Sequence, residues 1–244
     1  MRIRVQSHNP SNSAKALAEH LQIPRLSTSS SRFVGRPSDI IVNWGNVNAV
    51  HNSHYLNPLQ AVKNAANKVT TFKQLQEASI PVPTVHYSKS TLEADKTYFA
   101  RTNLFGHSGD GIEVGIPTEL PEAQLYTEFI KKKHEYRAIV VDDEVVDLKK
   151  KLKKRDFEGD RSPYVWNVAN GYIFARNDIE FPPTLPQLAI DATKALNLSY
   201  GAVDIIQDRN GNLYVLEINT AFGIIGETIS KVGEAIKKLI NKRI

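Results

Sequence analysis

Residues 202–219 read AVDIIQDRNGNLYVLEIN, two apolar runs joined by a polar turn. Nearly continuous apolar runs of this length are typical of strands that are buried on both faces. An Asn-Gly pair between two such runs favours a hairpin, so we predict a two-residue type I′ loop at Asn210-Gly211. In that register Arg209 pairs with Asn212, and Asp204 lies directly opposite Glu217.

The predicted hairpin brings three oxygen-bearing side chains to one face. Opposed side chains are ~4.5–5.5 Å apart at Cβ, and Glu217 and Asn219, two residues apart, project to the same side. Two adjacent carboxylates raise a pKa or destabilise the pair, whereas Mg²⁺ accepts such ligands. The alternative is that Asp204 or Glu217 faces solvent beside a cation. The apolar flanks disfavour it, because a buried carboxylate without a partner is costly.

The composition indicates an ordinary globular protein. The 244 residues leave room for one large domain or for two to three small ones. The chain has no cysteine, which excludes disulfides, thiolate-bound zinc and a cysteine nucleophile. Met1 leads into a short strand-like run, not into a signal peptide, and no apolar stretch reaches the ~18 residues that a membrane span needs. We therefore expect a cytoplasmic protein.

The first 60 residues predict a small α/β unit. Apolar positions at 14, 17, 18 and 21 have helical spacing, between strands expected at Ile3–Val5 and Asp39–Asn43. Trp44-Gly45-Asn46 follows the second strand, where open α/β sheets place ligand contacts. A plain turn is the alternative for that motif.

After a boundary near residue 60, helices and strands alternate differently. Thr71 and Gln74 fit the capping box of a short helix. Strands are expected at residues 97–101, 124–130, 136–141 and 144–148, with a glycine-rich loop at residues 102–112. Residues 149–175 show no period and predict a long loop. A helix capped by Thr184 and a closing helix through residues 229–240 frame the hairpin.

Basic residues cluster in two places. Residues 149–155 hold six cations and Lys131-Lys132-Lys133 adds three, in a chain of net charge +5. Such runs are commonly solvated faces. The functional alternative is a lip that attracts phosphates or an acidic substrate.

Together these features resemble the ATP-grasp superfamily, in particular the carboxylate–amine ligases related to ribosomal-protein-S6 glutamylating and glutathione-synthesising enzymes. The resemblance covers roughly residues 60–225. It implies an α/β (α+β) fold in which two α+β subdomains clasp ATP: residues 61–125 with the glycine-rich flap and residues 126–244 with the metal site. Residues 1–60 resemble the small α/β domain that precedes the grasp. The motif at residues 43–45 also looks like ATP-grasp proteins of tailed phages.

The resemblance assigns roles to individual residues. It implies phosphate contacts and a catalytic role for Arg101, a phosphate contact for Lys68, and a catalytic role for Arg137, which faces the same cleft as Glu135. Glu135 is expected to accept the ribose hydroxyls, and Lys149 to contact the nucleotide. The flap would contain Gly106, Ser108, Gly109 and Gly111, the adenine hinge Glu128, Phe129 and Ile130, and the metal site Asp204, Glu217 and Asn219. Asn167 and Asn170-Gly171 loosely resemble a substrate-proximal segment.

The implied reaction is an ATP-dependent ligation with two Mg²⁺ ions. A substrate carboxylate attacks the γ-phosphate, and an amine then displaces phosphate from the acyl phosphate to give an amide. Positioning and charge neutralisation dominate such chemistry, so we nominate no nucleophile. This sequence departs from the family in two places: Arg101 replaces a lysine, and Thr220-Ala221-Phe222-Gly223 stands where the family often has a proline-bearing loop.

Three alternatives remain open at the sequence level. The protein could bind the nucleotide without turnover, or transfer phosphate to a small molecule as a kinase does. A nucleic-acid binder built on residues 149–155 would show salt-dependent affinity, but few aromatic residues interleave those lysines. The expected partners are small-molecule or peptide carboxylates and amines, and the acceptor could be a large acidic polymer. No membrane partner is expected.

Overall fold

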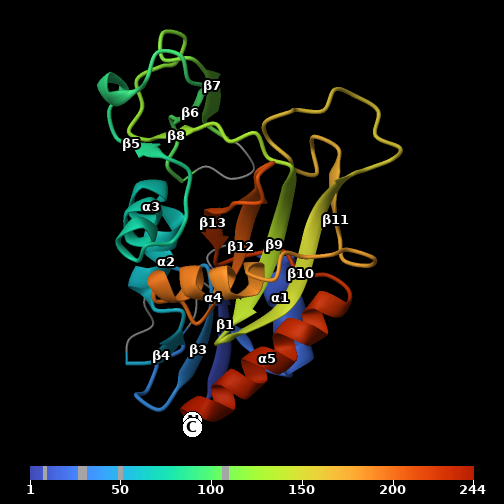
Figure 1. Cartoon of the computed structure of the whole chain (residues 1–244). Helices are drawn as coiled ribbons and strands as arrows, with labels where there is room; N and C mark the ends of the chain where they lie inside the picture. Colours follow the sequence, from blue (N-terminus) through green and yellow to red (C-terminus); the bar gives the residue numbers. More distant parts are fainter. Residues whose placement is uncertain (8–9, 27–31, 49–51, 106–109) are drawn as a thin grey trace.

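The computed structural model describes residues 1–7, 10–26, 32–48, 52–105 and 110–244. In these residues the chain forms three sheets with helices packed against them (Figure 1). The first sheet is parallel, in the order β2-β1-β3-β4. Its strands are β1 (Ile3–Ser7), β2 (Arg25–Leu26), β3 (Ile40–Trp44) and β4 (His54–Leu56), and α1 (Asn12–Leu21) connects β1 to β2. The expected N-terminal α/β arrangement of strands and helix is therefore present.

A second, antiparallel sheet in the order β5-β8-β6-β7 lies at the upper left of Figure 1. Two helices precede it, α2 (Leu59–Ala66) and α3 (Lys68–Glu77). The elements of the sheet are β5 (Val85–His86), the 3₁₀ turn η1 (Lys89–Thr91), β6 (Tyr98–Arg101), β7 (Ile112–Gly115) and β8 (Tyr126–Glu128).

The capping box predicted at Thr71 is wrong. Asn67 caps α3, because its side-chain oxygen accepts hydrogen bonds from the backbone N–H groups of Val69 and Thr70. Thr71 lies inside the helix, where its hydroxyl donates to the carbonyl of Asn64 at 3.0 Å. Lys68 is consequently the first residue of α3 and is held at a fixed helix end.

The third sheet is antiparallel, in the order β11-β10-β9-β12-β13. Its strands are β9 (His134–Val141), β10 (Glu144–Lys153), β11 (Tyr172–Ala175), β12 (Tyr200–Gln207) and β13 (Leu213–Asn219). The helices of this region are α4 (Leu185–Ala195) and α5 (Glu227–Arg243).

The basic run differs from its prediction. β10 does not end at Leu148 but continues to Lys153, and Lys150 to Lys153 pair with β11. The loop predicted at residues 149–175 is therefore shorter and spans residues 154–171. Most of the lysines belong to a strand, so alternate ones project to opposite faces of the sheet.

Two apolar cores lie on the two faces of the third sheet. On β9, Tyr136, Ala138 and Val140 pack with α4 and with residues of α2 and α3. Ile139 and Val141 face the other way and pack with α5, α1 and the first sheet. Glu135 and Arg137 share that second face, since side chains on a strand alternate. The cleft described below is the polar continuation of this face.

Asn57 joins the first sheet to the third. It is fully buried and has a left-handed backbone, with φ 65°. Its side-chain oxygen accepts hydrogen bonds from the N–H groups of Ser199 at 2.7 Å and Tyr200 at 3.0 Å, and its amide donates to the Tyr200 carbonyl at 2.8 Å. The start of β12 is thereby fixed to the end of β4. No helix within the described ranges is long and apolar enough to span a bilayer.

Candidate functional site

A cleft of about 590 Å³ lies between the second and third sheets. Its lining comes from α3, β6 to β13, the segment 164–169, and the loop after β13. Most of the residues singled out from the sequence line it: Lys68, Arg101, Glu128, Phe129, Ile130, Glu135, Arg137, Asn167, Asp204, Glu217 and Asn219. Residues distant in sequence thus converge on one cavity.

The predicted opposition of Asp204 and Glu217 is confirmed, although the predicted loop is wrong. The strands end at Gln207 and Leu213, which pair with each other, so the connection has five residues and not two. Gly211 has a positive φ of 93° whereas Asn210 does not, which excludes a type I′ turn. An irregularity between Asp204 and Ile205 then shifts the register by one and restores the pairing of Asp204 with Glu217.

The cross-strand register continues this pair into a row of charges. Glu217 pairs with Asp204, Asp204 with Arg137, and Arg137 with Lys149. The guanidinium of Arg137 binds Asp204 with two hydrogen bonds of 2.6 Å, one to each carboxylate oxygen. This planar, two-bond geometry is specific to arginine. It fixes the Asp204 side chain beside Glu217.

Lys68 reaches Glu217 from the opposite wall of the cleft. Its ammonium lies 2.5 Å from one carboxylate oxygen, and the amide of Asn219 donates to the other at 2.9 Å. Burial would raise the pKa of the Glu217 carboxyl, but the charge and hydrogen bond of Lys68, the Asn219 amide and the charge of Arg137 together lower it below its ordinary value. Glu217 is therefore ionised, and its carboxylate is bonded both by Lys68 of α3 and by Asn219 of β13.

Arg101 lines the same region with bonding capacity to spare. Its Nε is buried and has no hydrogen-bond partner among the described residues. Burial lowers the pKa of the guanidinium, and the nearby Glu217 charge opposes that shift. An unpaired buried N–H donor is costly, so Arg101 offers a donor to an anion in the cleft.

Glu135 is buried between two lysines. The ammonium of Lys132 lies 2.6 Å from one carboxylate oxygen, and Lys151 bonds the other. Arg137, two residues further along the same face of β9, binds Asp204 and not Glu135. Lys151 comes from the strand extension of β10, where it shares a face with Lys149.

One end of the cleft is aromatic. The rings of Phe99, Phe129 and Tyr164 contact one another edge-on, with centroid separations of 5.6, 6.3 and 5.4 Å. They come from β6, from the segment after β8, and from the loop 154–171. Flat apolar walls of this kind suit an aromatic base.

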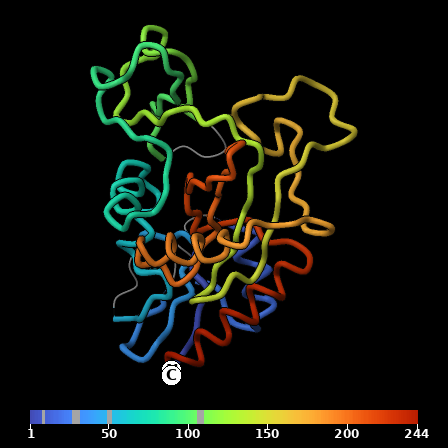
Figure 2. Tube along the Cα trace, viewed as in Figure 1, coloured from blue at the N-terminus to red at the C-terminus, as the bar shows by residue number. Residues whose placement is uncertain are grey.

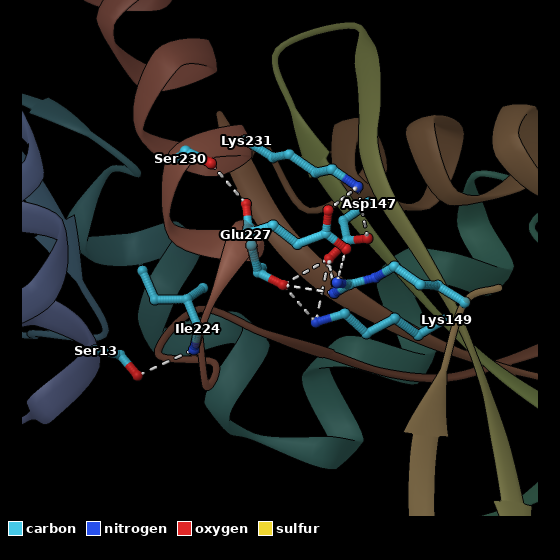
Figure 3. Close-up of polar contacts among 9 residues, drawn as sticks. Ser13, Asp147, Lys149, Ile224, Glu227, Ser230 and Lys231 are labelled. Carbon is cyan, nitrogen blue, oxygen red and sulfur yellow. Dashed lines mark hydrogen bonds and ion pairs between the residues drawn. The ribbon is translucent and has the colours of Figure 1, made fainter.

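Lys149 lies outside the cleft. Its ammonium bonds the hydroxyl of Thr228 at 2.8 Å and the carboxylate of Asp147 at 3.1 Å (Figure 3). Arg176 also binds Asp147 and Thr228. This network anchors the first turn of α5 to β10 and to the residue that follows β11. Because α5 begins where the loop after β13 ends, the network also fixes the end of that loop.

The same loop contacts the N-terminal unit. The ring of Phe222 packs on Trp44 with centroids 4.6 Å apart, and the backbone N–H of Ile224 donates to the Ser13 hydroxyl at 3.1 Å. A Cβ added to Gly45 would lie 2.5 Å from that of Ala221. The predicted ligand-proximal motif at Trp44-Gly45-Asn46 thus supports a cleft-lining loop.

Part of the glycine-rich loop, Gly106, Ser108 and Gly109, lies outside the described residues. Gly111 is described and has a φ of +67°. A side chain there would meet Asn103 at 2.5 Å, so the turn requires glycine. The adjacent Asp110 and Ile112 line the cleft, which places the base of the loop at its wall.

Some lining residues were not anticipated from the sequence. Lys132 and Lys151 belong to the two basic runs but had no assigned roles, and Phe99 and Tyr164 had none either. Alternation along a longer β10 would have indicated Lys151. Nothing in the local pattern indicates Tyr164, because its contacts come from other segments.

The donor set near Glu217 suits a hard cation. Asp204, Glu217 and Asn219 offer carboxylate and amide oxygens on one face, and Mg²⁺ is typically held by one or two carboxylates together with phosphate oxygens. Within the described residues no group of three or more His, Cys, Asp or Glu side chains could hold a metal ion by itself. The residues therefore fit a magnesium ion that is shared with a phosphate ligand.

Comparison with known proteins identifies relatives over the same region. Residues 109–242 match the sequence model of the RimK-like ATP-grasp domain. The chain is 31% identical over 221 residues to the tetrahydromethanopterin:α-L-glutamate ligase of Methanocaldococcus jannaschii, covering 79% of this chain and 72% of the relative. It is 28% identical over 191 residues to a probable α-L-glutamate ligase of Haemophilus influenzae, covering 69% of this chain and 59% of the relative.

The fold also matches solved structures. The ATP-grasp ligase PsnB, in complex with a minimal precursor, Mg and ADP, aligns with a TM-score of 0.66 at 14% identity, covering 96% of each chain. At that identity the likeness shows the fold alone. It confirms the fold class that the sequence resemblance implied.

Proposed function

This chain belongs to the RimK-like ATP-grasp family and is an ATP-dependent ligase that forms C–N bonds, and we propose that the cleft joins a substrate carboxylate to an amine through an acyl phosphate. The observation that carries the proposal is the opposition of Asp204 and Glu217 across β12 and β13, beside Asn219. Lys68, Arg101 and Arg137 surround this acidic face with cations. That combination suits a magnesium–triphosphate.

The nucleotide would lie along the cleft. The base enters the aromatic end at Phe99, Phe129 and Tyr164, next to the Glu128–Ile130 hinge, and Glu135 accepts the ribose hydroxyls. The phosphates then reach Lys68 and Arg101. Support comes from the free donor on Arg101 and from the position of Lys68 at the start of α3. The glycine-rich loop closes over the phosphates in this proposal.

Asp204, Glu217 and Asn219 would hold magnesium, and we propose two ions. When bound, the metal would supply positive charge that offsets the negative charge of the transferring phosphoryl group. The protein supplies the geometry. Arg137 orients Asp204, while Asn219 and Lys68 fix the two oxygens of Glu217.

The chemistry balances without a protein nucleophile. A carboxylate oxygen of one substrate bonds to the γ-phosphorus as the bond to ADP breaks. The amine nitrogen of the other substrate then bonds to the acyl carbon, the acyl–phosphate C–O bond breaks, inorganic phosphate leaves, and the nitrogen releases a proton. Arg137 would orient the carboxylate through the guanidinium nitrogen that does not bind Asp204.

The relatives are named as α-L-glutamate ligases, and we propose glutamate or an acidic amino acid of that class as the amine substrate of this chain. The carboxylate substrate would be a small molecule or a peptide and would enter beside Ala221, Phe222 and Gly223, which line the far end of the cleft. In this proposal the functional units remain residues 1–60, 61–125 and 126–244, and the enzyme acts in the cytoplasm.

Substitution of Glu217 by alanine tests the proposal. Binding of the non-hydrolysable analogue AMP-PNP is measured by calorimetry with and without Mg²⁺. The parent should bind more tightly with Mg²⁺, and Glu217→Ala should lose that dependence. Glu144→Ala, at an exposed position at the start of β10, is the matched control. Circular dichroism verifies that the variants fold. Unchanged magnesium dependence in a folded Glu217→Ala protein would contradict the metal assignment.

A product assay tests the reaction. The enzyme is incubated with Mg-ATP, L-glutamate and a mixture of carboxylates, and products are identified by mass spectrometry. An amide that appears with stoichiometric ADP and phosphate is expected. A phosphoester product would instead show a phosphotransferase.

A further inference from the structure

Lys132 is a buried lysine that the proposed reaction does not use. It precedes β9, and its side chain is only 9% exposed. Its ammonium contacts three groups: the Glu135 carboxylate at 2.6 Å, the backbone carbonyl of Tyr164 at 3.0 Å, and the face of the Trp166 ring at 4.6 Å. A buried ammonium is stable only where such partners replace water.

Neutralisation of Glu135 does not explain Lys132. Lys151 already bonds the other oxygen of that carboxylate, so the trio carries a net positive charge. Two of the three contacts of Lys132 go to the loop 154–171 and not to the sheet. Its position therefore serves the loop as well as the carboxylate.

The loop 154–171 holds its own shape. Its ends are joined by a hydrogen bond from the Lys154 N–H to the Gly171 carbonyl at 2.9 Å. Inside it, the Asn170 amide donates to the Val165 carbonyl at 2.8 Å, and at its end the Trp166 ring stacks on Tyr172 of β11 with centroids 5.0 Å apart. In Figure 2 it is the gold loop at the upper right. These contacts hold the loop to itself and to the start of β11.

Lys132 and the ring of Tyr164 connect the loop 154–171 to the aromatic end of the cleft. Tyr164, whose carbonyl Lys132 binds, places its ring against Phe99 of β6 and against Phe129. The other contacts that hold this segment are these edge-on ring contacts, which are individually weak, and contacts with Tyr172 of β11, whose N–H donates to the Asn167 carbonyl and whose ring stacks on Trp166. Lys132 adds the contact that ties residues 164–169 to the start of β9.

We infer that Lys132 is a positioning residue that fastens residues 164–169 as a wall of the nucleotide site, through the Tyr164 carbonyl and the Trp166 ring. The inference rests on the proposed nucleotide site. It assigns the loop to the base and ribose end of the cleft, and it makes Glu135 the common anchor of the ribose and of the wall.

Two readouts test the inference separately. Acrylamide quenching of tryptophan fluorescence reports on Trp166, because the other tryptophan, Trp44, is fully buried. Trp166→Phe should abolish the quenchable signal and so verifies the assignment. AMP-PNP affinity in the presence of Mg²⁺, measured by calorimetry, reports on the site.

Lys132→Met should increase the quenching of Trp166 in the nucleotide-free protein and weaken AMP-PNP binding about tenfold, since a charged hydrogen bond is lost. Lys132→Arg should recover part of both losses. Lys131→Met removes an exposed neighbouring lysine and should change neither. Lys151→Met removes the other partner of Glu135 and should leave Trp166 quenching unchanged.

The outcomes separate the possibilities. Unchanged quenching in Lys132→Met overturns the inference, even if affinity falls, because Lys132 would then act on Glu135 or on the nucleotide directly. Increased quenching with unchanged affinity also overturns it, since the loop would be no wall of the site. Equal quenching in Lys132→Met and Lys151→Met would overturn the specific role of Lys132. If the parent protein does not bind AMP-PNP, the proposed nucleotide site fails, while quenching still tests whether Lys132 holds the loop.

Discussion

Replacement of Asn57 by alanine should destabilise the whole protein. The change removes three buried hydrogen bonds and leaves the N–H groups of Ser199 and Tyr200 and the Tyr200 carbonyl without those partners. Each buried polar group that loses its partner costs about 1–3 kcal/mol. The sum over the three groups is roughly 3–9 kcal/mol, which is a large part of the ~5–15 kcal/mol that stabilises a typical domain.

Backbone strain adds a smaller, separable cost. Asn57 has a φ of 65°, where alanine is disfavoured by roughly 1–2 kcal/mol. Asn52→Ala is the matched control, because Asn52 has a φ of 63° but is exposed. The difference between the two variants isolates the hydrogen bonds.

Urea denaturation followed by circular dichroism gives both free energies of unfolding by linear extrapolation. We expect the midpoint of Asn57→Ala to fall well below that of Asn52→Ala. Equal losses in the two variants would refute the reasoning, because the buried hydrogen bonds would then contribute nothing to the junction between the first and third sheets.

Three further predictions concern the cleft and its surroundings. Gly45→Ala should lower the free energy of unfolding by roughly 2–4 kcal/mol, since the residue has a φ of +71° and a new Cβ would meet Ala221 at 2.5 Å. Thermal unfolding should show a lower melting temperature, and an unchanged melting temperature would contradict the close packing. Arg137→Met should cost about 3–5 kcal/mol in urea denaturation, because Asp204 is left as an unpaired buried carboxylate, and Arg137→Lys should cost less. Burial and two neighbouring lysines lower the pKa of His134 below its ordinary 6.5, so the unfolded chain takes up a proton first as the pH falls. This contribution to stability should be fully present above about pH 6.5 and decline below it, and His134→Gln should abolish that part of the pH dependence of unfolding.

In the hairpin of β12 and β13, local sequence predicts the contact between Asp204 and Glu217 correctly but the length of the connecting loop incorrectly. The apolar runs fixed the two strands, and the Asn-Gly pair correctly marked the reversal. The actual loop is longer because the Asp208 carboxylate binds the N–H groups of Asn210 and Asn212, both at 2.8 Å. Side-chain bonding of this kind competes with the shortest turn. The irregularity next to Asp204 compensates for the extra loop residue.

The extension of β10 could not be predicted from local pattern. A run of lysines resembles a solvated loop until its partners are known. Lys149 pairs with Asp147, two residues away on the same strand, but Lys151 pairs with Glu135 of β9, whose register against β10 depends on the whole sheet. Tertiary ion pairs therefore overrode a weak local preference.

The cleft residues that belong to a family motif could be predicted from the sequence. The cleft residues that reach the cleft only through the packing of distant loops could not. Lys68, Arg101 and Glu217 follow from the family pattern. The wall at residues 164–169 and the contact between Trp44 and Phe222 depend on which loops meet in space. No spacing along the chain encodes those meetings.

The irregularity between Asp204 and Ile205 has a consequence for how this protein could change over time. An insertion or deletion in a hairpin loop normally shifts the register of both strands, which turns every side chain to the other face. Here the strand segments on either side of the irregularity keep separate registers. The distal loop at residues 208–212 can therefore change in length, with the misfit absorbed at residue 216, while Asp204 and Glu217 stay opposed. Changes in the length of the loop at the tip of the hairpin therefore need not alter the pairing at its metal-binding end.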